Sequence, residues 1–256
     1  MDSDKLFLNT LYDRQRVCRD KGIITFTKFL DLNGQSVFSS MSRDCGVLQF
    51  LFGGYAQAER KIGVFVPASY GITSEDEFEA YAQEIPLCVI RIDKDRFSSL
   101  SHRDYLGAIM NTGITRESIG DIVADESGAY VVAFDEIGQY LKNELSRIGR
   151  ATVKTSNSDF SFISAKTPDT KDSFVTVASL RLDNIVSVAF SLSRKNAAAE
   201  ISAGKVFVND ILTEKADYRV PVGAKIVLRG KGKAVLSEQT GKSRKDRPQI
   251  VIKRYL

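Results

Sequence analysis

Two basic residues lie at the start of a predicted helix, a position suited to binding a phosphate group. Arg194 and Lys195 follow Ser193, a natural helix N-cap, and so fall in the first turn of a predicted helix that ends near Gly204. The helix dipole disfavours cations at this end, so helix stability alone does not explain the pair. Free backbone amides and two positive charges together favour binding of a phosphate group. A solvated basic surface is the alternative interpretation.

Glycine and lysine alternate in a second basic segment, Arg229-Gly-Lys-Gly-Lys233. It follows short strands predicted at 206–208 and 225–228, and we expect it to be a loop whose main chain and charges both approach a phosphate. A last strand is predicted at 250–252. Before it lies a third basic segment that contains Lys242, Arg244, Lys245 and Arg247.

The positive charge is concentrated at the C-terminal end of the chain. Residues 181–256 hold 16 Lys and Arg against 7 Asp and Glu, a net charge of +9, whereas residues 1–180 carry a net charge of −5. A basic domain attracts phosphate and releases the counterions condensed around a nucleic acid. The C-terminal part is therefore predicted to bind a polyanion.

No enzyme signature accompanies these basic segments. The sequence has no Walker phosphate loop, no Gly-x-Gly-x-x-Gly fingerprint and no Cys-x-x-Cys pair. His102, the only histidine, is expected to begin a helix or touch RNA rather than act as a general base. Asp104 and Asp121 could form a carboxylate pair, but a helix cap and a strand-edge turn are their ordinary roles. We therefore expect no catalytic residue, no metal site and no cofactor.

Four segments are predicted along the chain, and together they give an α+β fold class. They are a small N-terminal α+β unit (1–75), a middle domain (76–156), a linker rich in Ser, Thr, Asp and Lys that includes Pro168 (157–176), and the basic C-terminal domain (177–256).

The middle domain is predicted to have the order β-α-β-β-α-β of a ferredoxin-like sandwich. One helix is expected to run from Ser101, in a capping box with Asp104, to Gly113. A second is expected from Asp135 through the position before Gly149. The strands are predicted at 87–92, 121–124, 130–134 and 151–154. This architecture occurs in RNA-recognition modules and in unrelated enzymes, so it defines no function by itself.

A long pattern links the C-terminal domain to a known family. It comprises Arg181, Leu182, Asp183, Ser193, Arg194, Ala197, Ile201, Gly204, Val206, Val208, Asn209, Val222 and Gly223. This pattern resembles the S-four (alpha-L) RNA-binding domain. The chain departs from the usual pattern at Leu192, Ala224 and Lys233, where Ile, Asp and Arg are common. The resemblance implies that the basic C-terminal domain binds folded RNA.

A second resemblance extends over nearly the whole chain. Its residues are Gly53, Gly54, Glu59, Arg60, the run from His102 to Gly107, Gly113, Ile114, Arg116, Gly120, Asp121 and Ile122. With the S-four pattern they resemble the bacterial YlmH family. The resemblance implies a three-part protein with an RNA-recognition-like middle domain. It also implies association with the large ribosomal subunit during rescue of stalled, tRNA-obstructed particles, and thus a role in ribosome-associated quality control.

The predicted partners are rRNA and tRNA, bound without catalysis. The predicted RNA-binding residues are Arg181, Ser193, Arg194, Lys195, Lys205, Asn209, Arg229, Lys231, Lys233, Lys242, Arg244 and Lys245, with His102, Arg103 and Arg116 as a second RNA surface. The sequence shows no signal peptide and no apolar stretch long enough to span a bilayer, so we expect a cytoplasmic protein with no membrane partner. We also expect a monomer.

Two other hypotheses remain open. S-four domains also occur in pseudouridine synthases and methyltransferases, so an RNA-modifying enzyme that docks its substrate through this domain is one alternative. The acidic N-terminal part could instead bind a protein partner while the basic end anchors the complex.

Overall fold

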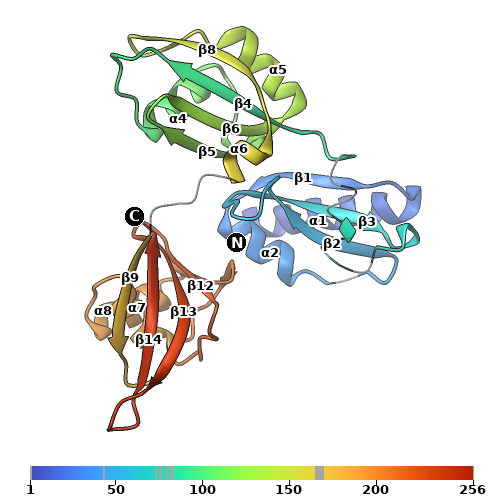
Figure 1. Cartoon of the computed structure of the whole chain (residues 1–256). Helices are drawn as coiled ribbons and strands as arrows, with labels where there is room; N and C mark the ends of the chain where they lie inside the picture. The colour runs from blue at the N-terminus through green and yellow to red at the C-terminus, as the bar shows by residue number, and fades with distance from the viewer. Residues whose placement is uncertain are drawn as a thin grey trace. The chain divides into compact units, whose positions relative to one another are not determined.

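The computed structural model describes residues 2–42, 44–72, 74, 77, 78, 81, 84–164 and 170–255, with backbone only for residues 2–4. The chain divides into two compact units, residues 1–166 and 167–256 (Figure 1). Within the described residues, no helix is both long and apolar enough to cross a membrane.

The first unit begins with a small sheet packed against two helices. The strands have the order β1-β3-β2, and both neighbouring pairs are antiparallel. Asp31 caps α2, because its side chain accepts a hydrogen bond from the Gly34 amide at 2.8 Å. The elements are α1 (Asp2–Lys21), β1 (Thr25–Leu30), α2 (Leu32–Ser40), β2 (Val47–Phe52), β3 (Lys61–Pro67) and the 3-10 turn η1 (Ala68–Tyr70).

The middle of the chain has the predicted β-α-β-β-α-β order. Its sheet order, β5-β6-β4-β8-β7, is that of a ferredoxin-like sandwich with one short extra strand, β7. The predicted capping box at Ser101 and Asp104 is present. The elements are β4 (Leu87–Lys94), α4 (His102–Asn111), η3 (Arg116–Ser118), β5 (Ile119–Asp125), β6 (Gly128–Phe134), α5 (Asp135–Glu144), β7 (Arg147–Ile148) and β8 (Ala151–Ser158).

The second helix of this sandwich ends earlier than predicted. α5 stops at Glu144, and Arg147–Ile148 form the short strand β7, which turns back into β8. Leu145 and Ile148 are both buried. Apolar residues at this spacing fit a continued helix as well as the observed short strand. Gly149, with φ +57°, serves this turn rather than a helix end.

The N-terminal sheet and the sandwich share one hydrophobic core, so the N-terminal part is not a separate unit. Phe29 of β1 and Val64 of β3 belong to the same buried cluster as Val89 of β4, Val132 of β6 and Ile163. The Phe134 ring at the end of β6 stacks on Phe26 at 5.8 Å between ring centroids. This packing covers the sandwich sheet on the side opposite α4 and α5.

The second unit is a six-stranded sheet with two helices on one face (Figure 1). The strand order is β11-β10-β12-β13-β14-β9, and every pair is antiparallel. The elements are β9 (Thr170–Thr176), α7 (Leu182–Ala189), α8 (Arg194–Ser202), β10 (Val206–Val208), β11 (Ile211–Leu212), β12 (Lys225–Leu228), β13 (Gly232–Lys242) and β14 (Pro248–Tyr255).

The segment expected to be a linker, 157–176, contains regular structure at both ends. β8 continues to Ser158, the short helix α6 covers Phe160–Ser164, and β9 pairs with β14 along its whole length. β9 is an edge strand in which only Val175 packs against the core, so its sequence shows little hydrophobic alternation. Pro168 lies outside the described residues.

Candidate nucleic-acid interface

A buried carboxylate organises the start of the two helices in the C-terminal unit. The Asp183 side chain is only 6% exposed and accepts hydrogen bonds from Arg181 Nε at 3.2 Å and from Arg194 Nε at 2.9 Å. Burial alone would raise the pKa of Asp183, but the hydrogen bonds and charges of the two arginines outweigh it and lower the pKa. Asp183 is therefore ionised at neutral pH and fixes both guanidinium groups.

The start of α8 presents amides and cations together. Ser193 caps the helix by accepting a hydrogen bond from the Asn196 amide at 3.2 Å, as predicted. Arg194 is 57% exposed despite its ion pair, and Lys195 is exposed. Among the described residues, the amides of Arg194 and Lys195 have no hydrogen-bond acceptor. Two free donors and two cations at one helix end can hold a phosphate group.

The other end of α8 is joined to the β12–β13 turn through the main chain, whereas the Arg229 guanidinium lies 5.6 Å from the centroid of the Phe207 ring. The Arg229 amide donates to the Lys205 carbonyl at 2.9 Å, which joins the end of the helix to the β12–β13 turn. Lys205 also pairs with Glu200 at 2.8 Å. The nine residues of α8 separate Lys205 from Arg194 by about 13 Å.

The predicted glycine-lysine loop is a tight hairpin turn. The Lys231 amide donates to the Leu228 carbonyl at 2.9 Å, and Gly232 already pairs with Leu228 as the first residue of β13. Gly230 and Gly232 have φ values of +81° and +100°, which non-glycine residues rarely adopt. Lys231 is exposed in the turn.

Lys233 belongs to a different surface from Arg194. It precedes Ala234, which is buried in the core beneath the helices, so strand alternation turns Lys233 to the opposite face of the sheet. There its ammonium lies 4.5 Å from the centroid of the Tyr255 ring. Lys233 of the predicted glycine-lysine loop therefore does not lie on the same face as Arg194.

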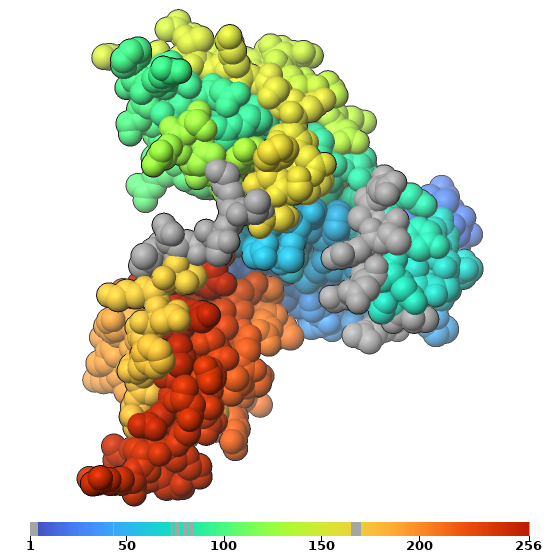
Figure 2. All heavy atoms as spheres, in the orientation of Figure 1, coloured from blue at the N-terminus to red at the C-terminus, as the bar shows by residue number. Residues whose placement is uncertain are grey.

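The third basic segment lies at the far end of the same hairpin. The tip between β13 and β14 carries Lys242, Arg244 and Lys245, and it protrudes from the unit (Figure 2). β13 has 11 residues, so the tip is about 33 Å from the Lys231 turn. Lys242 pairs with Asp246 at 2.8 Å.

One predicted RNA contact has a structural role, and two further basic residues lie near the predicted ones. Asn209, with φ +49°, shapes the β10–β11 turn and accepts a hydrogen bond from the Lys225 amide at 2.9 Å. Arg219 forms a bridge with Arg181 in the backbone, and the Arg254 guanidinium lies 5.7 Å from the centroid of the Phe190 ring on the helix side. The alternation of Ile250, Ile252 and Arg254 along β14 could have placed Arg254 on this face.

The second predicted RNA surface does not form one group of free cations. Arg116 Nη1 donates to the carbonyls of Ile119 and Gly120, both at 2.9 Å. Burial, followed by the charge of Arg60, lowers the pKa of Arg116 to about 10, so it stays protonated. Burial and the charge of Arg116 lower the pKa of His102, which is therefore neutral at pH 7.

The two aspartates considered as a catalytic pair have separate structural partners. Asp104 accepts hydrogen bonds from the Ser101 amide and hydroxyl, both at 2.7 Å, and these bonds lower its pKa. Asp121 accepts a hydrogen bond from the Tyr55 hydroxyl at 2.7 Å and from the amides of Glu59 and Arg60 at 2.7 and 3.0 Å. Asp121 thus joins the segment between β2 and β3 to β5.

Two family models match the chain. The model of the YlmH RNA-binding domain matches residues 74–161, and the model of the S4 (S-four) domain matches residues 180–226. The first match covers the ferredoxin-like sandwich, and the second runs from the loop before α7 into β12. The chain thus contains two regions of different fold that resemble domains of RNA-binding families.

Two similar proteins carry ribosomal names. The chain is 28% identical over 251 residues, 98% of its length and 95% of the relative, to the Bacillus subtilis (strain 168) ribosome-associated protein quality control protein P2. It is 35% identical over 94 residues, 36% of this chain and 45% of the relative, to the Kosmotoga olearia small ribosomal subunit protein uS4.

A solved structure agrees with the fold. The cell division protein ylmH from Streptococcus pneumoniae superposes with a TM-score of 0.50 at 20% identity, over 63% of this chain and 94% of that one. Together with the two domain matches and the full-length relative, this confirms the resemblance to the YlmH family.

Proposed function

We propose that the protein binds rRNA or tRNA on the large ribosomal subunit, without catalysis, during quality control of stalled translation in the cytoplasm. The two RNA-binding domains and the ribosome-associated relative support the general class of this function. The large subunit and the kind of RNA are the proposed details.

The start of α8 is the observation that carries the proposal. Two unpartnered amides lie beside two cations, and the buried carboxylate of Asp183 holds one of these cations in place. Fixing the Arg194 side chain before binding reduces the entropy lost when it contacts a phosphate. Arg181, held by the same carboxylate, extends the basic surface toward α7.

These groups are suited to reading RNA shape rather than sequence. Amides at a helix start and guanidinium groups hydrogen-bond phosphate oxygens, which are the same in every nucleotide. Lys205, exposed just beyond the other end of α8, provides a second contact along a folded RNA backbone. The same surface can bind tRNA or rRNA. The shape of the RNA must therefore determine where on the subunit the protein binds.

Reversal of charge at the helix start tests the proposal. We expect the double variant R194E/K195E to bind large ribosomal subunits at least about tenfold more weakly at physiological salt, because two phosphate contacts become repulsive. The measurement is co-sedimentation of the protein with purified large subunits across a range of protein concentrations.

The matched control is K142E/K154E, which makes the same change of charge on α5 and β8 of the other unit. We expect this control to bind nearly as tightly as the wild type. Equal loss in the two double variants would show that total charge, and not the α8 start, determines binding.

A further inference from the structure

The sandwich domain cannot use its sheet in the way common RNA-recognition modules do. Those modules stack bases on aromatic side chains of an open sheet. Here the Phe134 ring of β6 is stacked on Phe26 and tilted against Phe29 at 5.2 Å, so this part of the sheet is covered by the N-terminal strands. An RNA segment must find another surface of this domain.

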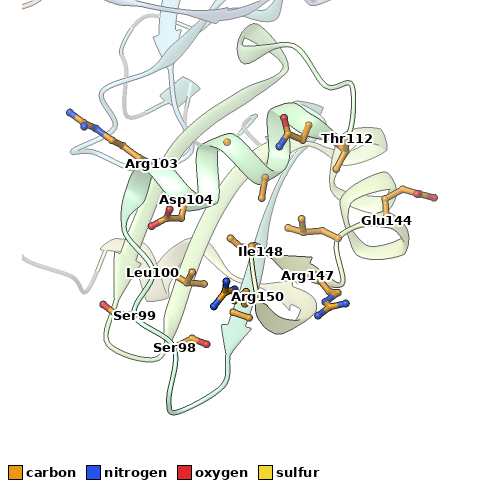
Figure 3. Close-up of a pocket in the computed structure, with 16 residues that line it drawn as sticks. Ser98, Ser99, Leu100, Arg103, Asp104, Thr112, Glu144, Arg147, Ile148 and Arg150 are labelled. Atoms are coloured by element: carbon orange, nitrogen blue, oxygen red, sulfur yellow. The ribbon is translucent and has the colours of Figure 1, made fainter.

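A cavity lies on the opposite side of the same domain. It has a volume of about 640 Å³ and lies between α4 and the β7–β8 turn (Figure 3). Gly107 and Ala108 give α4 a low surface at this position, and Ser98 and Ser99 line the cavity from the loop before α4. The volume is in the range of sites that hold small ligands.

The charges around the cavity favour an anion. Arg147 lies in β7 and Arg150 lies in the β7–β8 turn, and neither has an ion-pair partner within the described ranges. The guanidinium of Arg150 lies beside Leu100 and Ile148, whereas Glu144 points away from the cavity (Figure 3). Asp104 is engaged by Ser101 in the helix cap. The positive charge is therefore available, although the first 180 residues are acidic as a whole.

An exposed aromatic residue directly precedes the two serines that line this cavity. Phe97 directly precedes Ser98 and is 99% exposed, so it contributes nothing to the packing of the domain. Its loop is held in place because the Asp95 carboxylate accepts hydrogen bonds from the amides of Phe97 and Ser98, both at 2.9 Å, and from the Ser98 hydroxyl at 2.6 Å. A fully exposed ring on a loop held in this way can stack on a nucleic-acid base.

We propose that this cavity and Phe97 form a site for single-stranded RNA. A base stacks on Phe97, Arg147 and Arg150 contact the adjoining phosphate, and the serine hydroxyls contact the ribose. Stacking is tolerant of sequence, because every base has an aromatic face. Of the second RNA surface predicted from sequence, only Arg103 lines this cavity, and its side chain points away from it (Figure 3). The inference rests on the proposed function in RNA binding, but it uses different residues.

The test uses the full-length chain in the R194E/K195E background, which removes the α8 contacts. The probe is a fluorescein-labelled ten-nucleotide uridine RNA, and the readout is fluorescence anisotropy. We expect F97A to weaken binding by about 5- to 100-fold, as for the loss of one stacked base. We expect R147E/R150E to weaken it at least about tenfold and to reduce its dependence on salt.

The matched controls are F162A, which removes another exposed phenylalanine from the same unit, and K142E/K154E. Both should bind the probe like the parent R194E/K195E protein. Binding unchanged by F97A and by R147E/R150E would overturn the site. If free uridine monophosphate bound as tightly as the RNA, the cavity would be a nucleotide site and the RNA assignment would be wrong.

The outcome is independent of the proposed function at α8. Failure of that proposal would appear as unchanged large-subunit binding by R194E/K195E. Failure of the cavity site would appear only in F97A and R147E/R150E with the single-stranded probe.

Discussion

At the scale of residues, one aspartate determines how the basic surface is presented. Asp183 is buried and ionised, and it fixes Arg181 and Arg194 while leaving both arginines partly exposed. The cost of burying this charge is offset by three charge-assisted hydrogen bonds from two partners. Removal of the carboxylate should therefore affect the stability of the C-terminal unit.

We expect D183N to destabilise the fragment 167–256 by about 1–3 kcal/mol at pH 7, because a charge-assisted network becomes weaker. The partners are half-exposed, so water limits the loss. Urea unfolding followed by circular dichroism measures it. A variant as stable as the wild type at pH 7 would contradict the role of this carboxylate.

The same network predicts a pH dependence of stability. The pKa of Asp183 is lower in the folded state than in the unfolded chain. Its contribution is therefore complete above the unfolded value of about 4 and disappears as the pH falls through the folded value. The difference in unfolding free energy between wild type and D183N should shrink between pH 5 and the acid limit of folding. A difference independent of pH would exclude this cause.

Part of the candidate site could be predicted from the sequence. Arg194 and Lys195 could be recognised because cations in the first turn of a helix are locally unfavourable. The sheet face on which Lys233 lies could not be predicted, because it depends on the register in which Gly232 pairs with Leu228. Phe97 gave no signal, because a lone phenylalanine beside polar residues is as common in cores as on surfaces.

At the scale of elements, β9 completes the C-terminal sheet beyond the part matched by the S4 model. It pairs with β14 over seven positions, from Thr170 to Thr176. Neighbouring side chains of β9 have opposite environments: Val175 packs against the core, whereas Phe174 is 77% exposed. This alternation provides a matched pair of variants.

We expect V175D to destabilise the fragment 167–256 by about 2–3 kcal/mol, because it places a carboxylate at the edge of the apolar core. The control F174D should cost less than about 1 kcal/mol, because the new charge remains in water. Urea unfolding measures both. Equal losses of stability in V175D and F174D would mean that β9 does not pack against the core through Val175.

Most elements were predictable, and the exceptions have local causes. The strong apolar periods of β4, β6, α7 and β14 identify them from sequence. The end of α5 and the strand β9 were missed, because Leu145 and Ile148 suit both helix and strand, and an edge strand needs few apolar residues. Tertiary pairing, which no local pattern contains, decides both cases.

At the scale of the whole molecule, the two RNA-binding domains lie in parts of the chain that have opposite net charge. The YlmH-type domain lies in the acidic first 180 residues, and the S-four domain lies in the basic remainder. The sharing of a core between the N-terminal sheet and the sandwich could not be foreseen, because it depends on contacts such as Phe26 with Phe134. On this account, electrostatic contacts of the S-four domain supply most of the salt-dependent binding.

The most direct test of that claim is the salt dependence of RNA binding. For a folded RNA such as tRNA, we expect a plot of log affinity against log salt concentration to have a slope of roughly −3 to −5, as for about four to six phosphate contacts. Reversal of Arg194 and Lys195 should reduce the magnitude of this slope by about 1.5 or more, and K142E/K154E should leave it nearly unchanged. Wild-type binding that does not change with salt, or a slope unaffected by R194E/K195E, would contradict the account.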